Sequence, residues 1–465
     1  MSGGTRESNY STPDVLIIGG GLAGLSAAVE LTSAGHSVLL VEQKPRLGGR
    51  VYSYVHPETG DEVDNGQHLL MGCYTETLAY LKRISALEKI TIQKNLSITF
   101  RKRSTGTAHL TALPFPAPFN VLFGLLRLNT LSLLDRVLLL RVGLDLLIKD
   151  PDANEYLHSV TVEQWLDGLH QSERSKKYLW DIIAIGALND STDKISAALF
   201  AKVLKSAFFG KRRNSSLAFP RSGLSSTLVD PAGGYVRNNG GTILLSTTVE
   251  NIVNGHRAIE SVRLSSGVTV RPGAVISAVP YFDIPKVFGN GEEVGIHHTD
   301  QFVSSPIVTL HLWFDRHFMH ENFAALLDSP LHWIFNKSKL YGHGEDGLLY
   351  LSIVISGADE MVERSKETLT ADARAELSKY YPGAAEARIV HSVIIKEKRA
   401  TFSPSVGIEK IRPPFATRYT NVFLAGDWTD TKLPATIEGA ILSGRKCAAL
   451  VRDTLKQHHL NGEFR

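Results

Sequence analysis

A glycine motif near the N-terminus limits the folds open to this chain more than any other feature. Gly19, Gly21 and Gly24 form the pattern G-x-G-x-x-G, which follows an apolar run at 15–18 and precedes an Ala- and Leu-rich stretch at 25–34. Between a buried strand and a helix, the first glycine permits a tight turn and the second lets the backbone approach a pyrophosphate. The third allows the helix to pack closely on the strand. The helix N-terminus then offers N–H groups to the phosphates. We therefore predict a dinucleotide-binding βαβ unit.

A carboxylate stands where the second strand of this unit is expected to end. Glu42 follows an apolar stretch at 37–41 and lies eighteen residues beyond Gly24. An acidic residue at about this distance can accept hydrogen bonds from both ribose hydroxyls of a dinucleotide. The spacing strengthens the prediction of a nucleotide site.

Length and composition exclude several classes of protein. A chain of 465 residues is too long for one simple core and suits two domains. Its net charge of +3 gives no sign of the basic face of a nucleic-acid binder, so no nucleic-acid partner is expected. Two cysteines, Cys73 and Cys447, cannot form a disulfide framework. Residues 1–12 show no apolar signal segment, so we expect a cytoplasmic protein.

Strands of the nucleotide-domain type recur far from the N-terminus. Apolar runs at 274–276 and 421–425 could extend the same sheet. We therefore predict a discontinuous nucleotide domain with a second, substrate-binding domain inserted into it. The predicted bounds are 13–110, 220–284 and 415–455 for the first, 111–219 and 285–414 for the second, and 1–12 and 456–465 for flexible tails.

A second glycine pair follows the predicted ribose-binding carboxylate. Gln43 comes directly after Glu42, and Gly49 and Arg50 close the run a few residues later. This run resembles the amine-oxidase and carotenoid-desaturase superfamily of flavoproteins. In that superfamily the glycine pair and the arginine lie along the pyrophosphate and the flavin of FAD. The resemblance therefore implies FAD as the dinucleotide.

The C-terminal region carries a second motif of the same superfamily. Gly426 and Asp427 end an apolar strand, and a helix is expected to begin near Ile437, after Thr436. In the family, the aspartate holds a ribityl hydroxyl and the helix N-terminus faces the flavin pyrimidine edge. A positive helix end suits this place because reduced flavin carries negative charge near N1 and O2. The loop contains no cysteine for a covalent link, so non-covalent FAD is expected.

The sequence between 64 and 74, D-N-G-Q-H-L-L-M-G-C-Y, resembles a segment of plant-type phytoene desaturases. Together with L-P-A-T-I-E-G-A at 433–440, it looks closer still to hydroxysqualene dehydroxylases. The resemblance runs from about Asp14 to Val451 and is thin in the middle. It implies an α/β fold with a Rossmann-like FAD-binding domain of the amine oxidase/desaturase type. An inserted α+β substrate domain and an apolar helical membrane-facing region complete the expected fold.

The same resemblance implies the reaction and the residues of the site. We expect reductive dehydroxylation of an isoprenoid lipid, hydroxysqualene, to squalene, as in hopanoid and squalene synthesis; the electron donor is not assigned. His68 is the first candidate for the proton donor, because histidine titrates near neutral pH, and Asp64 is the second. The expected FAD contacts are Gly19, Gly21, Leu22, Ala23, Gly24, Glu42, Gln43, Gly49, Arg50, Gly66, Gln67, His68, Val249, Gly426, Asp427, Thr436 and Ile437.

An apolar stretch at 113–148 is the expected entrance for lipid. Aromatic and aliphatic residues crowd around three prolines, and Arg127, Arg136 and Arg141 stand among them. Such a patch could rest on anionic lipid, which predicts peripheral contact with the inner membrane; a buried core helix is the alternative reading.

Three other functions stay open on the sequence alone. The same fold could serve a carotenoid desaturase or isomerase, or a flavin-binding partner without catalysis. It could also serve an amine oxidase, in which Trp428 would form one wall of an aromatic cage. No metal site is expected, because His311, His317 and His320 lack recognisable ligand spacing.

Overall fold

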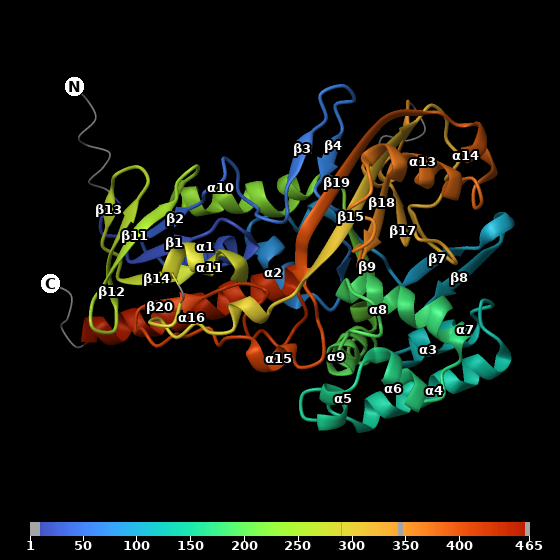
Figure 1. Cartoon of the computed structure of the whole chain (residues 1–465), viewed down its shortest axis with the longest axis horizontal. Helices are drawn as coiled ribbons and strands as arrows, with labels where there is room; N and C mark the ends of the chain where they lie inside the picture. Colours follow the sequence, from blue (N-terminus) through green and yellow to red (C-terminus); the bar gives the residue numbers. More distant parts are fainter. Residues whose placement is uncertain (1–9, 290, 343–346, 461–465) are drawn as a thin grey trace.

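The computed structural model describes residues 10–289, 291–342 and 347–460. The expected tails at 1–9 and 461–465 therefore lie outside the described residues. At one end of the molecule stands a five-stranded parallel sheet in the order β10-β2-β1-β14-β20 (Figure 1). Its strands are β1 (Val15–Ile18), β2 (Val38–Val41), β10 (Thr242–Leu244), β14 (Ala274–Ser277) and β20 (Val422–Leu424). Three separate stretches of the chain thus build one sheet.

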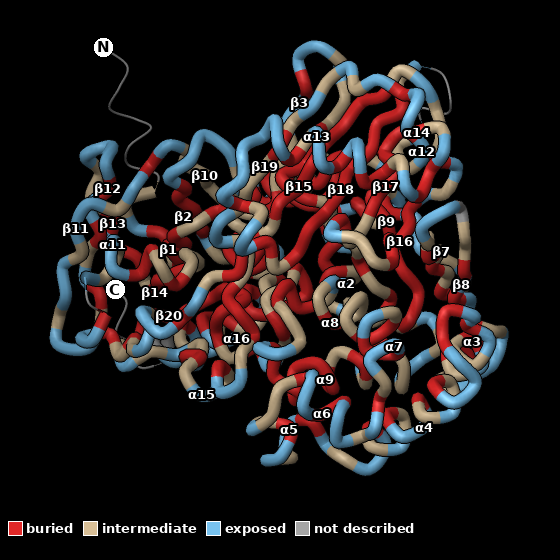
Figure 2. Tube along the Cα trace, turned by 45° about the vertical axis from the view of Figure 1, so that its right-hand side comes forward, coloured by how far each residue is buried: buried red, intermediate tan, exposed pale blue. Residues whose placement is uncertain are grey.

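The central strands of this sheet are buried at every position, and all their residues except Ser277 are apolar, because both faces are covered (Figure 2). One set of alternating side chains, including Val15 and Ile17, packs against helices. The other set, including Leu16 and Ile18, packs against an antiparallel sheet. The helices are α1 (Leu22–Ser33), α10 (Asp230–Asn238) and α16 (Ile437–Leu460), and the covering strands are β11 (Val249–Asn254), β12 (Ile259–Leu264) and β13 (Thr269–Val270).

Helix α16 packs across α1 at very short range, although the two are more than 400 residues apart in sequence. A Cβ added to Gly444 would lie 2.1 Å from the backbone O of Ala23. The Ser26 hydroxyl donates to the backbone O of Ile441 at 2.8 Å. Residues 456–460, which the sequence assigns to a flexible tail, continue this helix instead.

A second sheet of seven strands fills the other half of the molecule in the order β19-β15-β18-β17-β16-β7-β8. Its strands are β7 (Ser97–Arg101), β8 (Thr107–Thr111), β15 (Ser304–Phe314), β16 (Phe323–Leu326), β17 (Trp333–Asn336), β18 (Leu349–Ser356) and β19 (Ile389–Phe402). The helix α13 (Lys366–Leu377) packs on one face of this sheet. The longest strand, β19, reaches from this sheet toward the parallel sheet (Figure 1). The sequence does not predict β19.

A layer of helices lies below the seven-stranded sheet in Figure 1. It consists of α3 (Phe119–Leu126), α4 (Leu133–Ile148), α5 (Glu155–Ser159), α6 (Val162–Gly168), α7 (Glu173–Ser175), α8 (Asp181–Leu188) and α9 (Ala197–Phe208). The predicted core residues Trp165, Leu166, Leu179 and Trp180 are buried there. Among the described residues, no helix combines the length and apolar character needed to cross a bilayer.

Further short elements lie between these strands and helices along the chain. They are β3 (Ser53–Val55), β4 (Glu62–Asp64), β5 (Leu70–Met71), α2 (Thr75–Arg83), β6 (Ile90–Ile92), β9 (Leu217–Pro220), α11 (Ile284–Phe288), α12 (Lys337–Leu340), α14 (Pro382–Glu386) and α15 (Ile408–Ile411). The predicted strand-turn-helix region at 61–87 contains β4, β5 and α2.

The close crossing of α1 and α16 makes a stability prediction. Gly444→Ala should lower the free energy of unfolding by about 1–3 kcal/mol, because the added methyl group overlaps the α1 backbone. Gly143→Ala in α4 is the control, because a Cβ there meets nothing within 4 Å. It should raise stability by about 0.5–1 kcal/mol through the better helix propensity of alanine. Urea unfolding measures both, and equal stability of the two variants would contradict the crossing.

Candidate active site

The predicted nucleotide-binding residues gather at one edge of the parallel sheet. Gly19 follows β1, Glu42 follows β2, Ala278 follows β14 and Gly426 lies just beyond β20. All these strands run in the same direction, so their carboxyl ends meet at this edge. The carboxyl edge of a parallel sheet is where open α/β folds bind ligands.

The turn between β1 and α1 is shaped by its glycines. Gly19 has a φ of +109°, and a Cβ on Gly24 would lie 2.0 Å from the backbone O of Gly19. A Cβ on Gly21 would meet nothing within 4 Å, so open space lies in front of this residue. Helix α1 has no side-chain cap and no acidic residue in its first turn. The N–H groups of Leu22 and Ala23 at this end can therefore receive an anion.

Glu42 is held in place at the end of β2. Its Oε2 accepts the backbone N–H of Gly20 at 2.7 Å, and its Oε1 accepts that of Lys44 at 2.8 Å. The side chain of Gln43 is exposed. Val249, at the start of β11, packs on the side of the sheet that includes Ile18. The structure therefore brings Glu42 and Val249 to the same edge.

The second glycine pair turns the chain back onto the first loop. Gly48 has a φ of +102° and its N–H donates to the backbone O of Gly20 at 2.8 Å. A Cβ on Gly49 would lie 3.2 Å from Gly21 Cα, so the two loops are in close contact. This turn delivers Arg50 to the C-terminal motif.

Arg50 joins three distant parts of the chain. Its Nη2 donates to Asp427 Oδ1 at 2.7 Å, and its Nη1 donates to the backbone O of Ala400 in β19 at 2.8 Å. Burial opposes the charge on Arg50, but the Asp427 carboxylate outweighs this effect and raises the pKa of the guanidinium. The ion pair therefore stays charged.

The loop between β20 and α16 is organised by Arg412, which the sequence analysis did not single out. This buried guanidinium donates to the backbone O atoms of Asp427 and Thr429 at 2.8 Å and of Leu433 at 2.7 Å. Burial lowers its pKa to about 10, so it is charged at neutral pH. At the end of the loop the Thr436 hydroxyl accepts the backbone N–H of Gly439 at 3.1 Å, and α16 begins at Ile437.

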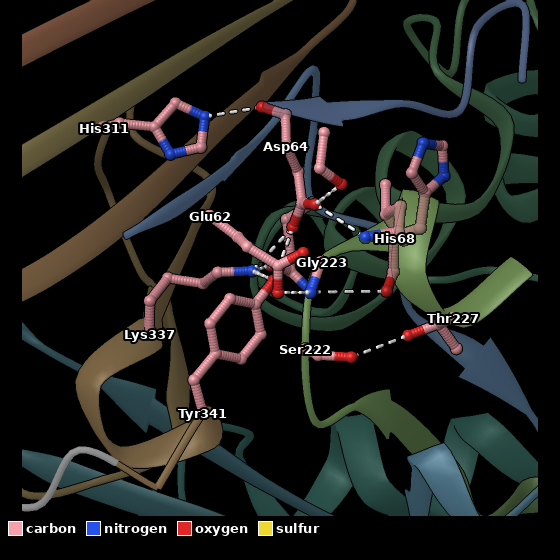
Figure 3. A network of polar contacts seen from close by, with 12 residues as sticks. Glu62, Asp64, His68, Ser222, Gly223, Thr227, His311, Lys337 and Tyr341 are labelled. Carbon is pink, nitrogen blue, oxygen red and sulfur yellow. Dashed lines mark hydrogen bonds and ion pairs between the residues drawn. The ribbon is translucent and has the colours of Figure 1, made fainter. Parts of the chain in front are cut away.

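Asp64 lies at the centre of a buried polar network (Figure 3). Its Oδ2 accepts hydrogen bonds from Lys337 Nζ and Tyr341 Oη, each at 2.7 Å. Its Oδ1 accepts from Ser53 Oγ at 2.7 Å and from the backbone N–H of Leu224 at 2.8 Å. Burial alone would raise the pKa of Asp64, but Lys337 and these donors lower it. Asp64 is therefore a fixed anion, which does not suit the expected role of proton donor.

His68 lies two residues before β5, the strand that pairs with β9. It is partly buried, and its ring makes no hydrogen bond to another described residue. Burial lowers its pKa to about 4; Arg50 and Lys337 act in the same direction, and Asp64 opposes them. His68 is therefore neutral near pH 7, able to donate one hydrogen bond and to accept another. Nearby, a Cβ on Gly66 would lie 3.5 Å from the Thr309 hydroxyl, which is buried without a hydrogen-bond partner.

The structure thus brings together most of the predicted residues and adds others. The side chain of Gln67 points toward Lys337, and its Oε1 accepts a hydrogen bond from Lys337 Nζ at 2.8 Å. Lys337 and Arg412 carry no motif that would reveal them in a single sequence. Lys337 binds Asp64, which lies 273 positions away in the chain. Arg412 binds backbone O atoms that lie 15 and 21 positions away.

These observations fit a dinucleotide that ends in a flavin. The open space at Gly21, the uncapped end of α1 and the carboxylate of Glu42 suit the ADP portion. Asp427 and the N-terminus of α16 suit the flavin portion. The fold and the site define the class of FAD-dependent oxidoreductases.

Comparison with known families agrees with this class. The model of the family described as flavin containing amine oxidoreductase matches residues 22–452. The chain therefore belongs to the flavin-containing amine oxidoreductase family, and it is an FAD-dependent enzyme.

The chain is similar to proteins with different activities. The chain is 28% identical to a hydroxysqualene dehydroxylase of Zymomonas mobilis, over 93% of this chain and 98% of that protein. It is 26% identical to a 15-cis-phytoene desaturase of Synechococcus elongatus, over 94% of this chain and 95% of that protein. A putrescine oxidase variant shares the fold with a TM-score of 0.71 at 18% identity, covering 96% of this chain and 99% of that chain.

FAD, when bound, supplies two-electron chemistry at the flavin. The residues of this chain would hold it at the phosphate loop, at Glu42 and at Asp427, and would present His68 beside the reaction space. His68, as a neutral imidazole, can orient a hydroxyl group of the substrate. A negative charge bound beside it would favour its protonated form.

The buried histidine His311 makes a pH prediction. Burial lowers its pKa to about 4, below the ordinary value near 6.5 of an unfolded chain. The unfolded state therefore binds the proton first, so this contribution to stability is complete above about pH 6.5 and is lost as the pH falls toward 4. Urea unfolding between pH 7 and 4.5 should show a loss of roughly 1–3 kcal/mol from this residue.

His311→Asn should make that pH dependence shallower, even though it also removes contacts to Asp64 and Tyr350. The exposed His256, replaced by Asn, is the control and should leave the slope unchanged. The idea fails if both variants keep the wild-type slope.

Proposed function

We propose that the protein reduces an isoprenoid lipid, with hydroxysqualene as substrate and squalene as product, and that its FAD is bound non-covalently. In this reaction the carbon–oxygen bond breaks and a carbon–hydrogen bond forms. The hydroxyl accepts a proton and leaves as water, and the two electrons come from reduced flavin. The observation that carries the lipid assignment is an exposed apolar surface on α3 and α4.

Helix α4 is apolar on both sides, which is unusual for a helix at a protein surface. Its buried side consists of Leu139, Val142 and Leu146, together with Asp135 of the N-terminal capping box. Its opposite side is also apolar, with Leu133 77% exposed and Ile148 83% exposed. The lipid-facing surface is defined here as Phe115, Phe119, Phe123, Leu133, Leu134, Val137, Leu140, Leu144, Leu147 and Ile148. A helix buried in the core, which is the alternative interpretation of this segment, would not expose these apolar side chains of α4.

Charged groups accompany this surface. Arg127 and Arg141 are exposed, and Arg136 is partly buried, with its guanidinium donating to the backbone O atoms of Leu126 and Leu131. Aliphatic side chains beside arginines suit the interface of an anionic bilayer. We propose peripheral contact there for a cytoplasmic enzyme, which would let an insoluble substrate enter from lipid.

The relatives support the same substrate class. The relatives at 28% and 26% identity are a hydroxysqualene dehydroxylase and a 15-cis-phytoene desaturase. The site segment 64–74 and the neutral His68 suit either lipid. We favour dehydroxylation because the amino-acid sequences of segments 64–74 and 433–440 resemble those of hydroxysqualene dehydroxylases. Desaturation of a polyene is the second candidate.

The arrangement of Trp428 disfavours amine oxidation. Its ring is 1% exposed, and its Nε1 donates to the backbone O of Val279 at 3.0 Å. Its ring also meets Phe302 edge-on, with centroids 5.9 Å apart. Trp428 therefore belongs to the core and does not offer a free face to an amine.

A single-turnover experiment tests the reaction. The purified protein is reduced without air and mixed with hydroxysqualene in detergent, and the flavin absorbance is followed while products are extracted. Reoxidation of the flavin together with formation of squalene is the expected result. His68→Ala should lower the rate of this step by about 10²–10⁴-fold if the imidazole takes part in proton transfer.

A flavin that stays reduced would count against dehydroxylation. The oxidised protein is then incubated with phytoene and with amines, which distinguishes the desaturase from the oxidase. The substitution His256→Ala, at an exposed position, is the control for the histidine change.

The lipid-facing surface is tested separately. Leu144→Glu combined with Leu147→Glu should lower binding to phosphatidylglycerol vesicles by more than about tenfold, since burying one leucine contributes about 1.5–3 kcal/mol. Leu450→Glu in α16 is the matched control, because Leu450 is also exposed but lies outside this surface. Co-sedimentation measures the bound fraction. Equal binding of the two proteins would contradict the assignment.

A further inference from the structure

A fully buried lysine lies beside the segment that carries His68. Lys337 begins α12, directly after β17 of the seven-stranded sheet, and its side chain is 0% exposed. An ammonium group has three N–H donors, and each finds an acceptor here. Nζ donates to Asp64 Oδ2 at 2.7 Å and to Gln67 Oε1 at 2.8 Å, and it also contacts the Tyr341 hydroxyl.

The two acceptors of greatest interest are the ends of one short turn. Asp64 ends β4, Gln67 precedes His68, and Lys337 connects the two from the opposite domain. The rest of the turn is held as well. The Asn65 side chain donates to the backbone O of Arg50 at 2.6 Å, and His311 Nε2 donates to the backbone O of Asp64 at 2.9 Å. The position of the turn is therefore fixed from both sheets.

His68 itself makes no side-chain hydrogen bond to another residue in the described ranges. Its placement depends on its neighbours in the chain, which are Gln67 on one side and the β5 strand on the other. Of these, Gln67 accepts a hydrogen bond from the charged Lys337 of α12. Figure 3 shows Lys337 and Tyr341 approaching Asp64 from one side, with His68 across from them.

A role in stability alone is a weak explanation for this lysine. Removing charge from the interior is often neutral or stabilising when both partners are replaced by apolar groups, because desolvation offsets much of the attraction. A buried ion pair is better explained by what it orders. Here it orders the turn that ends at His68.

We propose that Lys337 is a positioning residue whose ammonium group binds both ends of the Asp64–Gln67 turn and thereby sets the position and the charge environment of His68. The charged groups that act electrostatically on the His68 ring are Asp64, Arg50 and Lys337. Asp64 favours a protonated imidazole, and the two cations oppose it. Burial is the main cause of the lowered pKa of His68, and Lys337 acts in the same direction. Only the assignment of His68 to catalysis rests on the proposed function.

The test is a titration of the His68 ring by NMR in the FAD-bound protein with labelled histidine. The chain has 17 histidines, so the His68 signal is assigned by its loss in His68→Gln. Lys337→Met removes the charge and the hold on Gln67, and the His68 titration midpoint should move upward by about one pH unit or more. Lys337→Arg keeps the charge and should leave the midpoint within about half a unit of wild type.

A matched control comes from another buried lysine. Lys176, in the helical layer, pairs with Asp167 at 2.7 Å, and Lys176→Met should leave the His68 midpoint unchanged.

Gln67→Leu removes one contact of Lys337 without breaking the ion pair between Lys337 and Asp64. It should lower kcat for the substrate more than about tenfold at unchanged thermal stability. This variant also serves if Lys337→Met does not fold.

The outcomes are distinguishable. A Lys337→Met protein that loses thermal stability but keeps the wild-type His68 midpoint would overturn the proposal, as would a Gln67→Leu protein with wild-type kcat. The NMR titration requires no substrate. A failure of hydroxysqualene to react would therefore overturn the proposed function and leave this titration intact.

Discussion

The ion pair between Arg50 and Asp427 is the contact on which the arrangement of the site depends. It joins residues 377 positions apart at 2.7 Å, and the same guanidinium binds the backbone of Ala400 in β19. Three segments therefore meet at one side chain: the second glycine turn, the C-terminal loop and β19 of the seven-stranded sheet. The Arg50 side chain is 35% exposed, and the Asp427 carboxylate and the Ala400 carbonyl each accept a short hydrogen bond from its guanidinium.

Similar chemistry recurs elsewhere in the interior. Arg412 binds three carbonyl groups of the loop that precedes α16, and Lys337 binds the two ends of the turn before His68. In each case a buried cation fixes an irregular segment whose backbone groups cannot pair within a helix or a sheet. The regular elements supply the hydrophobic core, and these cations supply the shape of the loops between them.

The proposed lipid chemistry joins the two ends of the molecule. The proposed reaction site lies at His68, which is affected electrostatically by Asp64 and Arg50. The lipid-facing surface lies on α3 and α4, in the helical layer packed below the substrate sheet. A substrate that enters from a bilayer would pass from apolar helices to a polar site in which a neutral imidazole and fixed charges are already in place. Preorganised groups of this kind lower the reorganisation required during reaction.

The sequence by itself determined the parallel sheet and its cofactor edge. The G-x-G-x-x-G turn, Glu42 and the Gly426-Asp427 strand end are local patterns whose geometry follows from the residues alone. The sequence did not predict β19, because its alternating exposed and half-buried residues give a weak pattern. It also assigned Asp64 a role in proton donation that the buried network does not suit. Only the tertiary structure determined the roles of Lys337 and Arg412. The charge state of a buried group depends on partners that the fold brings from distant parts of the chain.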